Sequence, residues 1–372
     1  MIPLYRPYLT GTERQYVNEC LASTWISSKG EFIGKFERRF ADFIGTDHVT
    51  TVCNGTVALH LALLAVGIGP GDEVIVPTLT YVASVNMIAA VGATPVFADS
   101  LEGTWQIDPS DIERAITPRT RAVMVVHLYG ASCDMKAITE ICRKNQILLI
   151  EDCAEAFGTS FSERHVGTFG DVATFSFFGN KTITTGEGGM VVARTSEILN
   201  KAVHLKTQAV SLTREYWHDE IGYNYRMTNI CAALGVAQLE HAESILQKKK
   251  QVARWYDQYL LGLPIKRQVE PAHSQHSWWL YSILVDSDCR DALRSHLRQA
   301  SVETRPLFPP VHMMPHHRGS HEFPVAQKIS EAGLSLPSYP DLTEANVRLI
   351  ASIISDFFEA MESQAVNTLR AG

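Results

Sequence analysis

The sequence lacks paired cysteines, long apolar runs and an export signal. Its seven cysteines are scattered along 372 residues and odd in number, which argues against a disulfide framework and against a zinc cage. No apolar run reaches the roughly 18 residues of a membrane span. The N-terminal segment lacks the charged and apolar regions of a signal peptide. We therefore expect a cytoplasmic protein without a membrane partner.

An excess of basic residues is also missing. Lys and Arg number 33 against 40 Asp and Glu, which gives a net charge of -7 and a pI near 6.1. Such a chain has no broad basic face for a nucleic-acid backbone, so DNA and RNA are not expected partners. The hydrophobic content of 45% is ample for a large core. The length suits one large domain and a smaller one.

Strand-length apolar runs alternate with helix-period segments from about residue 48 to residue 205. This alternation is typical of a parallel α/β sheet. The expected architecture is a large α/β domain over residues 1–247 and a smaller α+β domain over residues 248–372. The expected strands are His48–Cys53, Glu73–Val76, Thr94–Ala98, Ala122–His127, Ile147–Glu151, Val172–Phe177, Met190–Ala193, Tyr281–Val285 and Ser301–Thr304. The expected helices include Thr56–Val66, Arg226–Lys250, Asp291–Gln299 and Glu344–Glu359.

The most informative feature is a lysine in a particular frame. Residues 176–189 read SFFGNKTITTGEGG, which sets Lys181 between an apolar strand and a glycine-rich turn. Asp152 follows another expected strand. A lysine amine can form an imine with an aldehyde cofactor, and a carboxylate can keep the cofactor's ring nitrogen protonated. The pattern predicts a pyridoxal 5'-phosphate site, the alternatives being a solvated lysine and an aspartate that caps a helix.

A phosphate site is expected where Asn54, Gly55 and Thr56 lead into a helix. Backbone N–H groups at a helix start bind anions, glycine permits close approach, and the Thr56 hydroxyl adds a donor. Taken alone, such a tripeptide also fits an ordinary loop. A second glycine series at residues 67–71 precedes a strand instead of following one, so it does not indicate a dinucleotide site.

These segments together resemble the DegT/DnrJ/EryC1/StrS sugar aminotransferases, which are pyridoxal-phosphate enzymes of fold type I. The order and spacing of the matching segments make the resemblance specific, and it runs nearly end to end. The matching segments are Ser23–Ser28, Asn54–Thr56, Gly69–Val74, Pro77–Tyr81, the lysine frame, Gly222–Arg226 and Arg305–Pro310.

The resemblance implies roles for several residues. Lys181 would anchor the cofactor and move protons during the reaction. Glu155 would lie near the cofactor ring, and Tyr81 would stack on it. Ser176 would contact the phosphate, as would Asn224 from the neighbouring subunit. A homodimer with shared active sites is therefore expected, and two dimers could pair into a tetramer.

The implied reaction is a two-step amino transfer. L-Glutamate would leave its amino group as pyridoxamine 5'-phosphate, which would then aminate the C4 ketone of a nucleotide-linked 4-keto-6-deoxy sugar. GDP-4-keto-6-deoxy-mannose, giving GDP-perosamine for surface polysaccharide, is the expected acceptor, and a UDP- or dTDP-linked sugar is the alternative. Dehydratase relatives carry histidine where this chain has Lys181, which argues for amine transfer. A cyclising relative, or a regulator that binds the cofactor without turnover, would carry a similar cofactor site.

The substrate pocket is less well marked. We expect it to be lined by Trp25, Ser27 and Lys29 on one side and by Arg305, Phe308 and His312 on another. Arg305 could pair with a substrate phosphate. His312, His316 and His317 lack carboxylate or cysteine companions at ligand spacing, so no metal site is expected and solvated loop histidines are favoured. Near the cofactor site, we expect His127, Glu151 and Cys153 to be structural.

Overall fold

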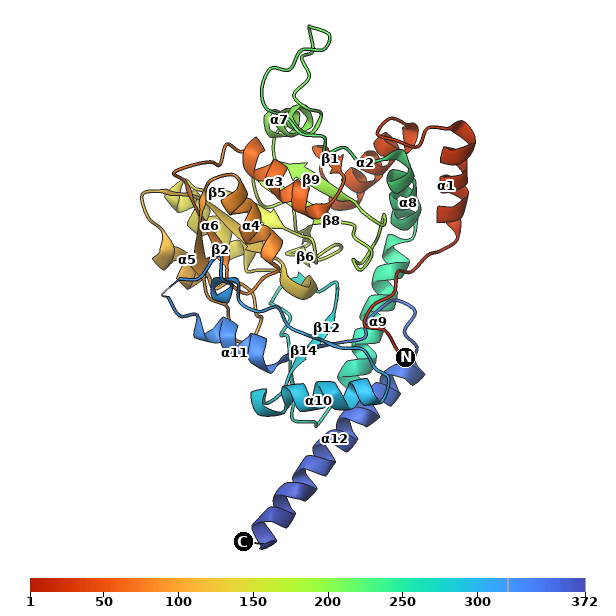
Figure 1. Ribbon diagram of the computed structural model, residues 1–372, viewed down its shortest axis with the longest axis vertical. Helices are drawn as coiled ribbons and strands as arrows, with labels where there is room; N and C mark the ends of the chain where they lie inside the picture. The colour runs from red at the N-terminus through yellow and green to blue at the C-terminus, as the bar shows by residue number, and fades with distance from the viewer. Residues whose placement is uncertain (320, 372) are drawn as a thin grey trace.

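The computed structural model describes residues 1–319 and 321–371 and is built around a seven-stranded sheet (Figure 1). Its strands are β1 (Val49–Val52), β2 (Glu73–Pro77), β3 (Thr94–Ala98), β4 (Thr120–Val126), β5 (Leu148–Asp152), β8 (Val172–Ser176) and β9 (Gly189–Ala193). The strand order is β1-β9-β8-β5-β4-β2-β3. Only β9 runs against its neighbours. The mostly parallel sheet predicted from the sequence is confirmed.

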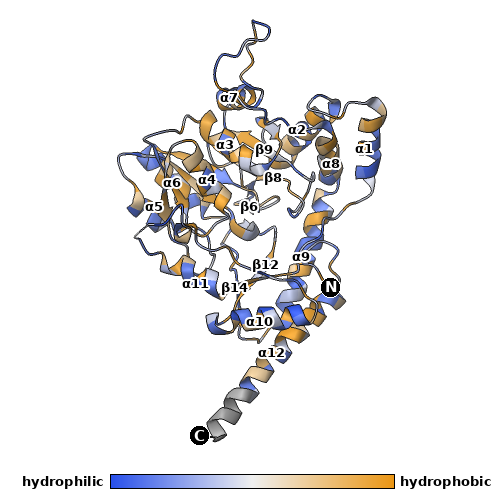
Figure 2. Ribbon diagram, viewed as in Figure 1, coloured by the Kyte–Doolittle hydropathy of each residue, from blue (hydrophilic) through white to orange (hydrophobic). Residues whose placement is uncertain are grey.

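Helices cover both faces of this sheet. One face carries α3 (Gly55–Ala65), α4 (Val82–Ala90) and α7 (Ser196–Lys206), and the other carries α5 (Pro109–Ala115) and α6 (Met135–Asn145). Alternate strand residues point to opposite faces, so Val74 and Val76 pack on the α3 side while Ile75 packs on the α6 side. Because both faces are buried, the strands read as apolar runs, which Figure 2 shows in orange.

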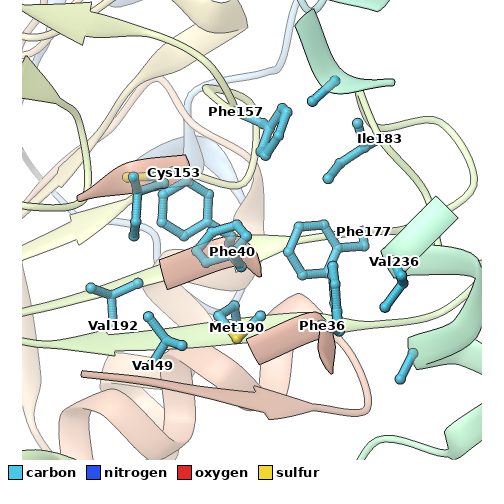
Figure 3. Packing of buried hydrophobic residues seen from close by; sticks show 14 of the residues in the cluster. Phe36, Phe40, Val49, Cys153, Phe157, Phe177, Ile183, Met190, Val192 and Val236 are labelled. Atoms are coloured by element: carbon cyan, nitrogen blue, oxygen red, sulfur yellow. The ribbon is translucent and has the colours of Figure 1, made fainter. Parts of the chain in front are cut away.

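An aromatic cluster fixes the end of β8. The helices at this end of the sheet are α1 (Thr12–Ser23), α2 (Glu31–Ile44) and α8 (Asn229–Glu240). The ring centres of Phe36 in α2 and Phe177 are 5.2 Å apart (Figure 3). Those of Phe40 and Phe175 are 5.0 Å apart. Because strand side chains alternate, burying Phe175 and Phe177 on this side turns Ser176 toward the opposite side, where α3 begins.

The C-terminal part forms a second core around an antiparallel sheet. Its strands are β10 (Lys266–Arg267), β12 (Tyr281–Leu284), β13 (Arg305–Pro306) and β14 (Gly333–Leu336), in the order β10-β12-β14-β13. The accompanying helices are α9 (Ala242–Tyr259), α10 (Ser287–Gln299), α11 (Pro324–Ala332) and α12 (Glu344–Ala371), with the short helices η1 (Leu128–Gly130) and η2 (Val311–Met313) elsewhere. A third sheet, ordered β11-β6-β7, joins β11 (Ser274–Gln275) to β6 (Ser160–Phe161) and β7 (Arg164–His165).

Helix α9 belongs to both cores. Leu246 packs in the core beside β8, whereas Val252 packs in the core of the C-terminal sheet. The first residues of the chain also join the C-terminal part, since Ile2 forms a bridge with Val302. The division at residues 247 and 248 stays a prediction, and the expected boundary falls inside this continuous helix.

Two expected elements differ from the structure. The single helix expected at Arg226–Lys250 is two helices, because the backbone turns at His241 (φ -115°, ψ 10°) between α8 and α9. Neither glycine nor proline stands at this corner, so the pattern gave no sign of it. The strand expected at Ser301–Thr304 pairs slightly later, at Arg305–Pro306. Among the helices of residues 1–319 and 321–371, none has the length and apolar character needed to cross a bilayer.

Candidate active site

Lys181 and two of the predicted cofactor residues lie at the carboxyl edge of the parallel strands. Asp152 ends β5 and Ser176 ends the adjacent strand β8. Lys181 follows in a turn closed by its own N–H, which donates to the carbonyl of Phe178 at 2.9 Å. Ligands of open α/β sheets bind at this edge, beyond the ends of neighbouring strands. The position of the lysine after β8 therefore agrees with a ligand site.

Lys181 is held on several sides. Tyr5 donates a hydrogen bond from its hydroxyl to the Lys181 carbonyl at 2.6 Å, and Trp279 donates from Nε1 to the Asn180 carbonyl at 2.7 Å. Lys181 Nζ lies 4.0 Å from the centre of the Trp279 ring. Burial lowers the pKa of Lys181, although the charges of Glu155 and Asp152 oppose this effect. A lowered pKa increases the fraction of amine that is free to act as a nucleophile or a base.

Asp152 is a buried carboxylate with two donors. The Ser84 hydroxyl donates to Oδ2 at 2.7 Å, and the Ala154 N–H donates to Oδ1 at 3.0 Å. Burial raises the pKa of Asp152, while these two hydrogen bonds and the charge of Lys181 lower it. The donors favour the ionised form, which is the form that could hold a proton on a pyridine nitrogen.

Glu155 is a second buried carboxylate in the same site. It is 3% exposed, and its Oε2 accepts the N–H of Tyr129 at 2.8 Å. Burial raises the pKa of Glu155 to about 7, with the charge of Lys181 acting in the opposite direction. A carboxyl group with this pKa can accept or donate a proton near neutral pH.

The structure brings two expected phosphate contacts together. A Cβ added to Gly55 would lie 2.6 Å from the Cβ of Ser176, so only glycine lets the start of α3 approach β8 this closely. The first N–H groups of a helix have no partners within it. Asn54 caps the N–H of Val57 at 3.0 Å, which leaves those of Gly55 and Thr56 for a ligand.

An aromatic group borders the site. Phe308 stacks on Tyr129, with 5.4 Å between ring centres and 17° between planes, and its other neighbour is Tyr81, 5.7 Å away. Tyr81 is 58% exposed at the start of α4, the helix that also carries Ser84. Of the six expected substrate residues, Phe308 is therefore linked to the cofactor site by direct contacts.

The other expected substrate residues lie in different surroundings. Trp25, Ser27 and Lys29 are exposed between α1 and α2. Asn229 ties this segment to the start of α8, because its N–H donates to the Ser27 carbonyl at 2.6 Å and its Nδ2 to the Trp25 carbonyl at 2.7 Å. Arg305 is exposed on β13, 3.6 Å from Glu303. The chain by itself does not connect these residues to Lys181.

His312 differs from the solvated loop histidine that we expected. It is 5% exposed, its Nδ1 shares a 2.6 Å hydrogen bond with the Thr78 hydroxyl, and its Nε2 faces Gln327 Nε2 at 3.4 Å. The expectation of solvation is wrong because η2 folds this residue against the loop after β2. Both ring nitrogens have partners within the chain, and the role of His312 at the substrate stays a prediction.

Asn224 lies on the surface of its own chain. Its Oδ1 accepts a hydrogen bond from Arg226 Nε at 3.0 Å, and its backbone pairs with Thr207. The next residue, Tyr225, accepts the N–H of Cys53 at 2.9 Å, just before the turn into α3. Asn224 is thus near the expected phosphate site, on an exposed segment that a second subunit could cover.

The interior also gathers His127, Glu151 and Cys153, whose possible ligand atoms lie within 4.8 Å of one another. His127 Nδ1 accepts the N–H of Cys133 at 3.1 Å, which directs an Nε2 proton at Glu151, also 3.1 Å away. Glu151 further accepts three backbone N–H groups of residues 167–170. These mutual contacts fit the structural roles that we expected.

Sequence reasoning missed several residues that shape the site. Ser84 contacts Asp152, and Tyr129 contacts Glu155. The turn that carries Lys181 is contacted by Tyr5 and Trp279. Tyr5 is 176 positions from Lys181 in the chain. No short motif links residues at such separations, although the position of Ser84 one turn after Tyr81 could have suggested it.

Comparison with known proteins agrees with this geometry. The profile of the DegT/DnrJ/EryC1/StrS aminotransferase family matches residues 7–355. GDP-perosamine synthase from Escherichia coli O157:H7 is 52% identical over 359 residues, covering 96% of this chain and 98% of the relative. GDP-perosamine synthase from Vibrio cholerae is 48% identical over 367 residues, covering 97% and 100%.

Solved structures share the whole fold. The aminotransferase TlmJ from Streptoalloteichus hindustanus has a TM-score of 0.94 and 30% identity, covering 97% of this chain and all of that one. Spr1654 from Streptococcus pneumoniae, solved in a PLP form, has a TM-score of 0.90 and 28% identity over 95% of this chain and 97% of that one. The chain therefore belongs to the DegT/DnrJ/EryC1/StrS aminotransferase family and is a transaminase that depends on pyridoxal 5'-phosphate.

Proposed function

We propose that this enzyme transfers the amino group of L-glutamate to the C4 ketone of GDP-4-keto-6-deoxy-mannose and so makes GDP-perosamine, a precursor of surface polysaccharide. Two GDP-perosamine synthases that are 52% and 48% identical to this chain over nearly its full length support this acceptor. The main observation in support of this chemistry is that the buried carboxylates of Asp152 and Glu155 lie close enough to Lys181 for their charges to act on its amine.

The residues present fit pyridoxal 5'-phosphate. Gly55 opens a cradle between α3 and β8 that a Cβ would fill. Two buried polar atoms beside Lys181, Asn180 Oδ1 and Thr182 Oγ1, have no hydrogen-bond partner among the described residues. When bound, the cofactor supplies an aldehyde for amino groups and a ring that accepts electrons from the carbon that loses a proton. Gly55, Thr56 and Ser176 would hold its phosphate.

The side chains divide the remaining work. Asp152 would hold a proton at the pyridine nitrogen, with Ser84 keeping the carboxylate ionised. The neutral amine of Lys181 can take the proton from the α-carbon of glutamate and later deliver one to C4 of the sugar. Tyr81, at the exposed side of the site, would cover the cofactor ring. Glu155 would contact the ring's hydroxyl.

Substrate recognition is assigned to two surfaces. Phe308, beside Tyr81, would contact the acceptor near the cofactor, and Arg305, three positions earlier, would pair with a phosphate of the nucleotide. Trp25, Ser27 and Lys29 would approach from the other side, and His312 would support the loop behind Phe308. These assignments are proposals that substitution can separate.

The active assembly in this proposal is a homodimer in which Asn224 reaches the phosphate of the neighbouring subunit. Residues 207–221, which precede Asn224, carry apolar side chains that are nearly fully exposed in one chain, with Leu212 98% and Tyr216 97% exposed. Figure 1 shows this segment, in green, extending beyond α7. A second copy would cover them and complete both sites. Seven free cysteines suit the reducing cytoplasm, where we place the enzyme.

The first test is the visible absorption spectrum with pyridoxal 5'-phosphate, before and after L-glutamate is added, for the wild type and Lys181→Ala. We expect a lysine-dependent band that glutamate removes. A band that ignores glutamate would point to another donor or to a binding role without turnover. A band that does not depend on Lys181 would exclude the mechanism.

The second test compares keto-sugar acceptors carrying GDP, UDP or dTDP in the same coupled assay. We expect the GDP-linked sugar to give the largest kcat/KM and a product mass that corresponds to replacing the ketone oxygen by an amino group and a hydrogen. Faster turnover of a UDP- or dTDP-linked sugar would overturn the acceptor alone. A product that has lost water without gaining nitrogen would indicate a dehydratase.

A further inference from the structure

A second lysine is buried near the site and has no carboxylate partner among the described residues. Lys249, in the middle of α9, is 1% exposed. Its Nζ donates to the backbone carbonyls of Trp279, at 2.8 Å, and Ser338, and lies 5.0 Å from the centre of the Tyr5 ring. Burial lowers the pKa of Lys249 to about 7, and no described acidic group offsets this effect. Either protonation state has enough hydrogens for both carbonyls.

Burying an amine in this way opposes folding. An unpaired ammonium loses its hydration, and a neutral amine must first release a proton. His276 does not provide a counter-charge, because burial, with the charge of Lys249 adding to it, lowers the pKa of His276 to about 3. An apolar side chain of similar length would avoid this cost but would leave the Trp279 and Ser338 carbonyls without this donor, so what Lys249 contributes is its two contacts.

The contacts of Lys249 lead to Lys181. Tyr5, whose ring faces Lys249 Nζ, donates its hydroxyl to the Lys181 carbonyl. Trp279, whose carbonyl accepts from Lys249, donates Nε1 to the Asn180 carbonyl and lays its ring against Lys181 Nζ. Two of the three groups that Lys249 contacts therefore hold the turn that carries the catalytic lysine.

The third contact secures the same region. Ser338 accepts from Lys249 through its carbonyl, and its own N–H donates to the carbonyl of Leu4 at 3.2 Å, one residue before Tyr5. Lys249 thus joins the segments at residues 4–5, 279 and 338. Because α9 packs in both cores, these contacts also fix how the C-terminal part presents Tyr5 and Trp279 to Lys181.

We propose that Lys249 is a positioning residue, which clamps Tyr5 and Trp279 so that the Lys181 amine keeps one orientation whenever it is not bonded to the cofactor. This inference rests on the proposed function, in which Lys181 moves protons while it is free. Lys249 itself would touch neither cofactor nor substrate. Its loss should therefore slow steps that need a correctly aimed Lys181 amine.

The test measures how fast cofactor-free protein takes up pyridoxal 5'-phosphate. In this step the Lys181 amine adds to the aldehyde carbon and water leaves, and a visible band grows. We expect Lys249→Met to slow this step by about tenfold or more, because misplacing a reacting group by about 1 Å can lower a rate by about a hundredfold. We also expect kcat to fall while KM for glutamate changes little.

Lys206→Met is the matched control. Lys206 is also buried, and its Nζ donates to the Thr51 carbonyl at 2.7 Å with Glu37 3.7 Å away, so its contacts lie on β1 and α2. Its substitution also removes a buried lysine and should change the melting temperature, but it should leave the uptake rate unchanged. Equal slowing in both variants would reduce the Lys249 effect to general destabilisation and overturn the inference.

Two gentler variants keep the test decisive if Lys249→Met does not fold. Tyr5→Phe removes only the hydrogen bond to the Lys181 carbonyl, and Trp279→Phe removes only the one to Asn180 together with part of the ring. Both should slow uptake, and normal uptake in both would overturn the inference. If the wild type forms no band that depends on Lys181, the proposed function fails instead, so the two failures are distinguishable.

Discussion

At the scale of single residues, the two buried carboxylates beside Lys181 differ in their donors. Asp152 receives a hydroxyl and a backbone N–H, whereas Glu155 receives one backbone N–H. Donors stabilise the ionised form, and burial without them favours the neutral form. Two donors thus counter the effect of burial on the pKa of Asp152, whereas Glu155, with a single donor, has a pKa of about 7.

Glu155 should make stability depend on pH. Its pKa in the folded protein is about 7, against 4.5 for the free side chain, so the folded state binds the proton more tightly. The protonated Glu155 therefore contributes fully to the free energy of unfolding below pH 4.5. This contribution, at most about 3 kcal/mol, is lost as the pH rises through 7. In cofactor-free protein, Glu155→Gln should therefore raise the melting temperature relative to wild type at pH 8 and not at pH 5.

The exposed Glu163→Gln serves as the control for this comparison, since it changes the same chemical group outside the site. Its melting temperature should follow that of the wild type at both pH values. If the melting temperature of Glu155→Gln differs from that of the wild type by the same amount at pH 5 and pH 8, Glu155 does not titrate in this range.

Ser84 should affect the reaction rate through its hydrogen bond to Asp152. Ser84→Ala removes the hydroxyl that donates to Asp152 Oδ2 and should raise the pKa of that carboxyl further. A hydrogen bond to a charged group contributes about 1.5–3 kcal/mol, so we expect the rate of the glutamate half-reaction to fall at least about tenfold. Stopped-flow absorbance with glutamate measures this rate. An unchanged rate would mean that Asp152 does not depend on Ser84.

At the scale of elements, the apolar pattern predicted the sheet well because its strands other than the edge strand β3 are almost entirely buried. All seven strands expected in the large sheet end within one residue of the observed strand. The alternation of Phe175, Ser176 and Phe177 even fixes which way Ser176 faces. The corner at His241 could not be predicted, since the apolar pattern continues across it and tertiary packing sets the turn.

The contact between α3 and β8 can be tested with one methyl group. Gly55→Ala would place a Cβ 2.6 Å from the Ser176 Cβ, so the start of α3 must shift away from the strand. Overpacking of this kind costs about 1–3 kcal/mol, and the shift also moves the N–H groups proposed to bind phosphate. Equilibrium dialysis should show weaker retention of pyridoxal 5'-phosphate.

Gly69→Ala provides the comparison. A Cβ at Gly69 would have its nearest neighbour, the Val91 carbonyl oxygen, at 3.9 Å, which is ordinary contact. This variant should keep both its stability and its cofactor affinity. If Gly55→Ala retained the cofactor as tightly as Gly69→Ala, the phosphate site at the start of α3 would be wrong.

At the scale of the whole molecule, long-range contacts decide what the sequence could not show. Lys181 and Asp152 were predicted because they follow strands within one stretch of chain, and Glu155 was predicted through the family resemblance. Tyr5 and Trp279 were not, because the fold brings them to Lys181 from both ends of the sequence. Trp25 and Arg305 could not be placed from the sequence either, and contacts within a single chain do not connect them to Lys181.

The shared active site of the proposed dimer makes a prediction that a single chain cannot satisfy. Lys181→Ala and Asn224→Ala should each inactivate or strongly impair a homodimer. In a mixed dimer with one subunit of each kind, one site lacks both residues, whereas the other combines an intact Lys181 with the partner's intact Asn224. Activity should therefore return to about half that of the wild type, because one of the two sites is complete.

Mixed dimers can be isolated by giving each variant a different affinity tag and purifying on both in turn. If Asn224 serves the site of its own chain, as its position beside Cys53 also permits, every site in the mixed dimer carries a defect and no activity returns. Recovery with Lys181→Ala paired to Asn224→Ala, but not with either variant paired to itself, requires Asn224 to act across the interface. The exposed segment at residues 207–221 would then be covered by the subunit whose site it completes.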